Sequence, residues 1–209
     1  CERVHETAGV SLGIRIDESP EIPVLLFDQG RSLRQAVVGL DTGWHEAVIY
    51  RRSDAWRSAI VLHQLLLEEG ADLAHPEPLP NSRIDFYGDS ILAGGSVEAV
   101  GFEGEEDSSI TLWNQEDTIT NGWWGFGAIT GRLLKAHAHI NGIGGLAMLD
   151  GTGWYGDPLV GFEQTWDKRN PVPGSMTPWN FSEFQPHVIV CSIGQNCARN
   201  GDIADPLHR

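Results

Sequence analysis

Short stretches of alternating apolar and polar residues, separated by Gly, Asp and Ser, fill the front third of the chain. Gln35–Leu40 and His45–Tyr50 are two of them, and such alternation is typical of half-buried β-strands. Ala59–Leu67 is long enough for a helix, but the β-branched residues near its start favour another strand. The pattern predicts a small all-β sandwich over residues 1–75.

A proline-rich connector follows this β-rich part. His75–Pro80 holds three prolines in six residues, which neither a helix nor a central strand tolerates. We therefore predict a linker at residues 76–81 and a second domain over residues 82–209.

Three strands of the second domain each end in a polar turn that contains glycine. Arg83–Tyr87 ends at Gly88-Asp89-Ser90, His139-Ile140 runs into Asn141–Gly145, and Pro186–Ile193 ends at Gly194-Gln195-Asn196. The continuous apolar run 186–193 predicts a strand buried on both faces of a parallel sheet. Because the carboxyl ends of parallel strands form the binding crevice of an open α/β sheet, we expect the three turns to converge.

Two helices are expected beside these strands. The first begins at Ser90, where the strand turns sharply and exposes the first helical turn. The second covers Trp123–Ala136, in which Phe126, Ile129 and Leu133 share one face. Together with the predicted parallel strands, these helices indicate an α/β domain.

The three turns carry the groups that acyl transfer needs. Ser90 is a candidate nucleophile, close to the unsatisfied N–H groups and the positive dipole end of its predicted helix. Gly144 or Gly145 offers a backbone N–H that can approach an oxyanion closely, and Asn196 offers a side-chain amide donor. Each motif alone is common in ordinary turns, but their order and their placement at strand ends favour a site.

The composition argues against several classes of binding partner. The formal net charge is −15, with 14 basic against 29 acidic residues, which argues against a nucleic-acid partner. The chain has no apolar run long enough for a membrane span. Eight Trp are consistent with a sugar-binding surface as well as with a core. Cys1, Cys191 and Cys197 have no zinc-site spacing, so neither a metal nor a cofactor is expected.

The same turns carry a family resemblance. Phe86–Ile91, Asn141–Gly145 and Ile193–Asn196 resemble the first three sequence blocks of SGNH (GDSL-like) hydrolases. The β-rich front part, with Trp44-His45 and Tyr50–Ala55, makes the chain most similar to carbohydrate esterase family 2. The resemblance implies a jelly-roll domain followed by a three-layer α/β SGNH domain, incomplete at its C-terminus.

The resemblance also implies a function. Family 2 esterases remove acetyl groups from plant polysaccharides such as xylan and glucomannan, so Ser90 becomes the nucleophile of an acyl-enzyme. Ser90, Gly144, Gly145 and Asn196 then form the oxyanion site. Aromatic residues near the site become candidate substrate walls, represented by Trp124, Trp154 and Trp179. An acetylated polysaccharide or oligosaccharide is the expected partner.

Two departures from the family pattern concern the third block and the base. Cys197 stands where the family usually has Asp after the block's Asn. The catalytic His normally follows that block by roughly a hundred residues, whereas here only Asp205–His208 matches Asp-x-x-His. That match lies too close to Asn196 for the usual strands and helix, so His208 is a weak candidate. We expect the base in a missing C-terminal segment or a second chain.

Two alternatives remain open. In the first, the chain is a carbohydrate-binding or surface protein that is catalytically inactive because it has no base. In the second, it is an SGNH lipase or thioesterase. The latter is disfavoured by the β-rich front part. A polysaccharide substrate predicts a secreted or cell-surface protein, and Cys1 at the start of the sequence would also suit a lipoprotein.

Overall fold

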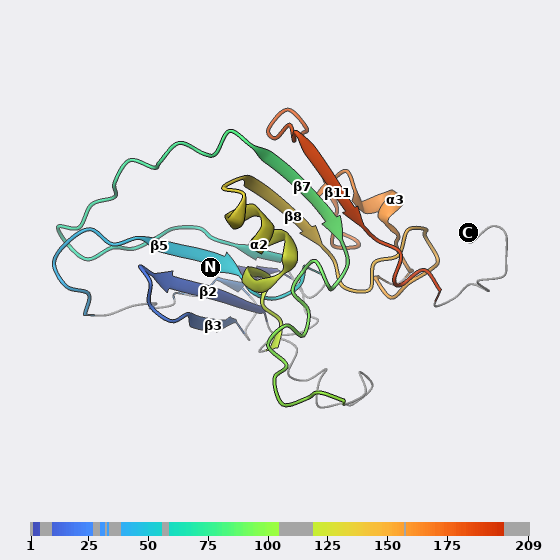
Figure 1. Cartoon of the computed structure of the whole chain (residues 1–209), viewed down its shortest axis with the longest axis horizontal. Coiled ribbons are helices and arrows are strands. Elements are labelled where there is room, and N and C mark those ends of the chain that lie inside the picture. The colour runs from blue at the N-terminus through green and yellow to red at the C-terminus, as the bar shows by residue number, and fades with distance from the viewer. Residues whose placement is uncertain are drawn as a thin grey trace.

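The computed structural model of the chain describes residues 2–4, 10–26, 30–31, 33, 39–55, 59–104, 119–156 and 158–198. Figure 1 shows the antiparallel strands of the front part beside a parallel sheet formed by later segments. Cys1, His208 and most of the predicted strand at 35–40 lie outside the described residues.

The front part consists of two antiparallel sheets of three strands. In the first, β2 (Val10–Ile16) lies between β3 (Ile22–Leu26) and β5 (Ala47–Arg51). In the second, β1 (Glu2–Val4) lies between β4 (Gly30–Arg31) and β6 (Ala59–Val61). The predicted β-rich character is therefore confirmed for the described residues, while closure into a jelly roll stays a prediction.

The strand expected over residues 59–67 covers only the first three of them. Only Ala59–Val61 pairs with another strand, and the chain is then irregular and exposed through the proline-rich connector to Ser82. Leu65 and Leu66 face solvent because no described strand continues the ladder beside them.

A parallel sheet carries the predicted site. Its central strand β7 (Arg83–Gly88) lies between β8 (His137–Gly142) and β11 (Val188–Ser192). Gly88 pairs in register with Gly142 on one side and with Ser192 on the other. The carboxyl ends of the three strands therefore lie at the same level, as predicted.

The prediction that the run 186–193 is buried on both faces is wrong for this structure. Val188 and Ile189 are 52% and 64% exposed. β11 lies at one edge of the sheet formed by the described residues, so it has one neighbouring strand and an incomplete cover. Its apolar side chains are suited to contact other apolar residues. The described part of the chain covers them only in part.

The predicted helix 123–136 is split in two. A short 3₁₀ helix, η1 (Gly122–Trp124), precedes α2 (Phe126–Leu133), and Gly125 caps the latter. The short β9 (Lys168–Asn170) and β10 (Thr177–Pro178) form a hairpin, and α3 (Phe162–Thr165) is a single turn. Figure 1 shows α2 lying over β8.

The buried face of α2 differs from the predicted one. Its buried residues are Gly127 and Gly131, whereas Leu133 is 79% exposed. A Cβ at Gly131 would lie 2.8 Å from the Cβ of Ala138 on β8, which is closer than real Cβ contacts. The helix therefore approaches the sheet through glycine, and the apolar periodicity pointed to the wrong face.

A buried ionic network joins the front sheets to the second part. Arg52 forms ion pairs with Glu21 and Glu98. The side-chain amide of Asn121 donates to both glutamates, at 2.9 and 2.8 Å. The Gly122 N–H donates to the Arg52 carbonyl at 2.8 Å. The two parts are thus in contact, and their division into separate domains stays a prediction.

An aromatic stack reinforces this contact. The Trp123 ring stacks on Tyr50 at 4.8 Å, and the Arg132 guanidinium lies 3.9 Å from the centre of the indole. Through η1, the front part therefore fixes the segment that packs against the turn after Ser90. No helix in the described ranges is long and apolar enough to cross a membrane.

Candidate active site

Ser90 lies directly after β7, in an irregular turn and not in the predicted helix. The Ala93 N–H donates to the Asp89 carbonyl, but the Gly95 N–H donates to the Ser90 carbonyl at 2.7 Å, which widens the turn. Gly94 has a φ of +75°, a left-handed conformation that ends helical continuation. The predicted helix dipole is therefore not available, and oxyanion stabilisation at Ser90 depends on individual N–H groups.

Asp89 holds the Ser90 turn in place. Its carboxylate is buried and accepts a hydrogen bond of 3.0 Å from the Ile91 N–H, so it spans the serine from one side to the other. The second carboxylate oxygen lies 3.5 Å from the side-chain nitrogen of Asn196. Asp89 thus orients the nucleophile turn and faces the loop after β11.

Glycine at the strand ends allows this turn to lie close to the sheet. A Cβ at Gly88 would lie 2.7 Å from the Leu92 Cβ, and one at Gly142 would lie 2.7 Å from the Ala93 nitrogen. The Ile143 N–H donates to the Gly88 carbonyl at 3.1 Å and links the ends of β7 and β8. The spacing of the glycines is therefore a consequence of close packing around Ser90.

The turn after β8 presents two backbone donors. Gly145 has a φ of +73°, and its carbonyl accepts a hydrogen bond of 2.8 Å from the Trp154 N–H. A Cβ at Gly145 would lie 2.6 Å from the Trp154 Cβ. Among the described residues, neither the Gly144 nor the Gly145 N–H has a hydrogen-bond acceptor. Both remain available to an oxyanion.

Asn196 ties the third turn to the other two. Its side-chain nitrogen donates to the Leu146 carbonyl at 3.1 Å, and its approach to Asp89 at 3.5 Å is at the limit of a hydrogen bond. One amide hydrogen is therefore committed to the loop after β8, and the other is only weakly engaged. The neighbouring Cys197 accepts from the Met148 N–H at 3.4 Å, a further link between the same loops.

No described histidine forms a hydrogen bond with Ser90, and its hydroxyl has no partner among the described residues. His45 pairs with Asp17, and His187 bonds Arg83 at the amino end of β7. His139 stacks on Phe184 at 3.6 Å. His208 lies outside the described residues, so its role as a base stays a prediction.

The three tryptophans proposed as substrate walls lie in different surroundings. Trp154, 52% exposed, contacts the Gly145 turn. Trp124, 43% exposed, ends η1 beside Arg132. Trp179 is half-buried and makes an edge contact with His139. Of the three, Trp154 is the one for which a contact with a predicted oxyanion residue is found.

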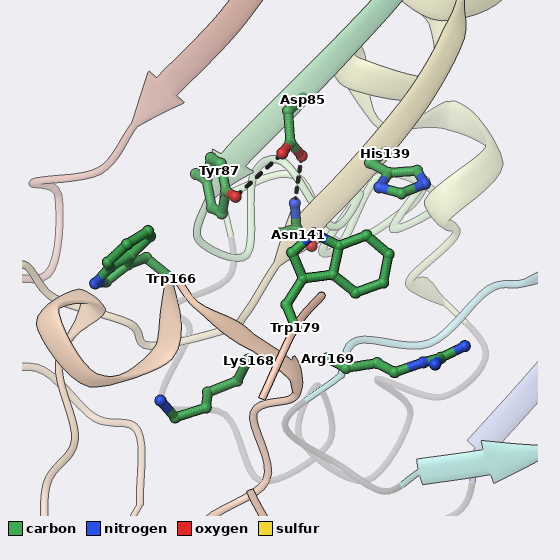
Figure 2. A pocket seen from close by; sticks show the side chains of 8 residues that line it. All are labelled: Asp85, Tyr87, His139, Asn141, Trp166, Lys168, Arg169 and Trp179. Carbon is green, nitrogen blue, oxygen red and sulfur yellow. Dashed lines mark hydrogen bonds between the residues drawn. The ribbon is translucent and has the colours of Figure 1, made fainter. Parts of the chain in front are cut away.

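A polar hollow on one face of the sheet was not predicted. Figure 2 shows side chains from β7 and β8 meeting residues of the β9–β10 segment around a space of about 90 Å³. It is lined by Asp85, Tyr87, His139, Asn141, Trp166, Lys168, Arg169 and Trp179. The signal was present in the sequence as polar residues at alternate positions of two strands, at Asp85 and Tyr87 and again at His139 and Asn141.

Hydrogen bonds hold the buried carboxylate in this hollow. Asp85 accepts from the Asn141 amide at 2.7 Å and from the Tyr87 hydroxyl at 3.1 Å. Burial raises the pKa of Asp85, although these two hydrogen bonds and nearby His139 act in the opposite direction. Burial lowers the pKa of His139. In the described ranges, no group of three or more metal-ligating side chains is found.

Comparison with known proteins identifies relatives. No protein-family model matches the chain. The cellulase/esterase CelE of Acetivibrio thermocellus is 30% identical over 184 residues, which cover 87% of the chain and 20% of that protein. The acetylxylan esterase/glucomannan deacetylase of Cellvibrio japonicus is 26% identical over 164 residues, 75% of the chain and 40% of that protein.

Solved structures agree on the fold. A family two carbohydrate esterase from Clostridium thermocellum, in complex with cellohexaose, has a TM-score of 0.77 at 24% identity and matches 99% of the chain and 59% of its own. A family two carbohydrate esterase from Cellvibrio japonicus has a TM-score of 0.71 at 18% identity, covering 97% and 57%. The chain spans 20% and 40% of the two sequence relatives and somewhat under two thirds of the two solved chains. The chain is therefore similar in sequence to these two esterases and similar in fold to family two carbohydrate esterases, over most of its own length and over part of theirs.

Proposed function

We propose that the chain contributes the nucleophile and oxyanion site of a serine esterase that removes O-acetyl groups from plant-type polysaccharides. One observation supports the proposal most strongly. The turns at Ser90, Gly144–Gly145 and Asn196 all follow the carboxyl ends of the parallel strands. Asn196 joins them through its hydrogen bonds to Asp89 and to the Leu146 carbonyl. This arrangement supplies a nucleophile beside several hydrogen-bond donors, which acyl transfer requires.

The chemistry follows from these groups. The Ser90 hydroxyl oxygen attacks the acetyl carbonyl carbon while a base takes its proton. The N–H groups of Gly144 or Gly145, together with the amide hydrogen of Asn196 that is only weakly engaged with Asp89, stabilise the negative charge on the carbonyl oxygen, each by about 3 kcal/mol. The base then protonates the departing sugar oxygen. Water hydrolyses the acetyl-serine and releases acetate.

The proposal places the base outside the described residues. Among the described histidines, His45 is held by Asp17, His187 by Arg83 and His139 by aromatic packing, and none of the described histidines bonds Ser90. We propose that a histidine on a further polypeptide segment acts as the base. His208 stays a candidate with the same role.

The sugar would lie against Trp154. This indole is exposed and adjoins the Gly145 turn, so its face is suited to stack on a pyranose next to the scissile ester. The Cellvibrio japonicus relative, named an acetylxylan esterase and glucomannan deacetylase, supports the substrate class. Trp124 and Trp179 would contact more distant parts of the substrate.

The organisation of the protein is part of the proposal. We assign residues 1–75 to a jelly-roll domain, 76–81 to the linker and 82–209 to the SGNH domain. The antiparallel front sheets, the irregular connector and the parallel sheet support this division. Because plant polysaccharides lie outside cells, the proposal includes secretion or display at the cell surface.

Acetate release from acetylated xylan tests the proposal, with imidazole added because no described histidine is placed to act as the base of Ser90. The chain should release acetate faster than Ser90→Ala under the same conditions. Ser182→Ala is the matched control, because Ser182 is exposed and bonded only to nearby Asn180. Equal rates for the chain and Ser90→Ala would refute the assignment and favour a sugar-binding protein without catalysis.

A further inference from the structure

We infer that Asn121 is a positioning residue for Ser90, and that the front part of the chain acts on the nucleophile turn through it. The inference rests on the proposed function, because it concerns the reactivity of the same serine. Asn121 lies directly before η1 and is completely buried. Its partners are groups around the Ser90 turn and not the serine hydroxyl, so its effect passes through the residues between them.

The backbone of Asn121 holds the turn that follows Ser90. Its N–H donates to the Gly94 carbonyl at 3.0 Å, and a Cβ at Gly94 would lie only 2.3 Å from the Asn121 carbonyl oxygen. The next residue, Gly95, donates its N–H to the Ser90 carbonyl at 2.7 Å, and a Cβ there would lie 3.2 Å from the Ser90 Cβ. Asn121 and Ser90 therefore contact two adjacent glycines, and a shift of one is passed to the other.

Both ends of the Asn121 side chain have partners. Its amide oxygen accepts a hydrogen bond of 3.0 Å from the Trp123 N–H and caps η1. Its amide nitrogen donates to Glu21 at 2.9 Å and to Glu98 at 2.8 Å. Glu21 lies directly before β3 in the front part, whereas Glu98 lies in the segment after the Ser90 turn. The side chain therefore joins the front part to the segment that carries the nucleophile.

The helix cap alone does not explain why this residue is asparagine. Aspartate caps a helix as well as asparagine does, because the cap needs only a side-chain oxygen. The two glutamates, however, need hydrogen-bond donors. The Arg52 guanidinium forms ion pairs with both Glu21 and Glu98, but its single positive charge balances only one of them. The amide of Asn121 supplies further donors without adding a charge to this largely buried network.

A small displacement of the Ser90 turn is expected to have a large effect on acyl transfer. The turn is held at two points. On one side Asp89 accepts a hydrogen bond from the Ile91 N–H, and on the other side the Gly94–Gly95 pair contacts both Ser90 and Asn121. Because a misplacement of about 1 Å can cost about 100-fold in rate, loosening the second point alone should slow the reaction strongly.

Reversing one hydrogen bond tests the inference. Asn121→Asp keeps the oxygen that caps η1, but it removes both donors and places a third carboxylate beside Glu21. Glu21→Gln supplies an amide that donates to this aspartate, while its oxygen still accepts from Arg52. With 4-nitrophenyl acetate as the reagent and imidazole added, we expect Asn121→Asp to slow acetylation of Ser90 by about 100-fold. The double variant should recover at least about tenfold of this loss.

Asn170→Asp is the matched control. Asn170 also holds a nearby N–H with its side-chain oxygen, that of Val172, and donates its amide to the Ser175 carbonyl at 3.0 Å. It lies in the β9–β10 hairpin, away from Asn121 and its glutamates. The same chemical change there should leave the acetylation rate as in the parent chain.

A second measurement does not depend on catalysis. Backbone hydrogen exchange shows whether the Gly95 N–H still bonds the Ser90 carbonyl. In Asn121→Asp we expect this amide to exchange at least about tenfold faster, while residues 138–141 of β8 keep their rate. Glu21→Gln is the milder change and should show the same effect to a smaller extent. It keeps the inference testable if Asn121→Asp does not fold.

The outcomes separate the inference from the proposed function. Slow acetylation in Asn121→Asp, recovery in the double variant and faster exchange at Gly95 would support both. A normal acetylation rate in Asn121→Asp, no recovery in the double variant, equal slowing in Asn170→Asp or unchanged exchange at Gly95 would each overturn the inference and leave the esterase intact. If the parent chain is not acetylated at Ser90, the proposed function fails, and exchange at Gly95 alone decides whether Asn121 positions the turn.

Discussion

The side-chain amide of Asn196 donates a hydrogen bond of 3.1 Å to the backbone carbonyl of Leu146. This bond joins the loop after β11 to the loop after β8, two segments 50 residues apart in the sequence. Because the same nitrogen also faces Asp89 beside Ser90, one side chain sets the spacing of all three turns.

Replacing Asn196 should therefore affect catalysis more than folding. Asn196→Ala removes the donor and the link between the loops, and we expect kcat of the esterase to fall by about 100-fold to 1,000-fold, as for other oxyanion donors. Asn196→Asp keeps the size but removes the N–H donors and should be equally impaired. Gln195→Ala, at an exposed neighbouring position, is the control. A normal kcat in Asn196→Ala would show that this amide does not serve the reaction.

The contact between α2 and β8 predicts a specific coupling. Gly131→Ala gains helix propensity but places its Cβ against Ala138, and we expect a net loss of about 1 to 3 kcal/mol in unfolding free energy. Ala138→Gly in the same protein should relieve the clash and restore part of the loss. A double-mutant cycle by chemical denaturation measures this coupling. If the effects of the two substitutions on the unfolding free energy are additive, α2 and β8 are not in the close contact that the structure shows.

The ionic network at Arg52 should stabilise the contact between the front sheets and the second part. Arg52→Ala leaves Glu21 and Glu98 without their buried partner, and we expect unfolding to become easier by about 3 to 5 kcal/mol. Arg169→Ala is the control, because this exposed side chain is 3.8 Å from Glu183 and should contribute under about 1 kcal/mol. Similar losses in the two variants would contradict a buried role for Arg52.

The half-buried His139 predicts a dependence of stability on pH. Burial lowers its pKa in the folded protein below the ordinary value of 6.5, so the unfolded chain binds the proton more readily. Its contribution is therefore present above pH 6.5 and is lost as the pH falls below that value. His139→Phe, which can keep the stack on Phe184, should flatten the decline in unfolding free energy from about pH 7.5 to about pH 5.

His45 provides the opposite case as a comparison. Its hydrogen bond to Asp17 raises the pKa of His45, so this pairing contributes at low pH and is lost as the pH rises through the raised value. His45→Gln should therefore make the decline toward acid steeper, whereas His139→Phe makes it shallower. The same direction of change in both variants would contradict the assignment.

The location of the turns that form the candidate site could be predicted from the sequence because its signals are local. The strand Arg83–Tyr87 and the turns at Ser90, Gly144–Gly145 and Asn196 were located by apolar runs that end in glycine and polar residues. The parallel register then placed their ends together, as expected. Local periodicity is sufficient to locate an element when neighbouring residues determine both the element and its boundary.

The incorrect predictions concern contacts between distant segments. The helix expected after Ser90 does not form: Gly94 has a left-handed conformation, and a Cβ there would lie 2.3 Å from the carbonyl oxygen of the distant Asn121. The face of α2 was misjudged because glycine packs closely without contributing to apolar periodicity. The exposure of β11 depends on which strand lies beside it, and an apolar run does not specify its neighbour.

Transfer of an acetyl group to Ser90 tests the central claim most directly. 4-Nitrophenyl acetate is a suitable reagent, because its leaving group departs without protonation and acylation then needs no general acid. Imidazole is added to take the proton of the Ser90 hydroxyl. We predict that mass spectrometry of the digested chain finds an acetyl group on the peptide containing Ser90, and that Ser90→Ala abolishes this modification. An unmodified Ser90 peptide, with acetyl groups elsewhere in the chain or nowhere, would contradict the assignment of Ser90 as the nucleophile.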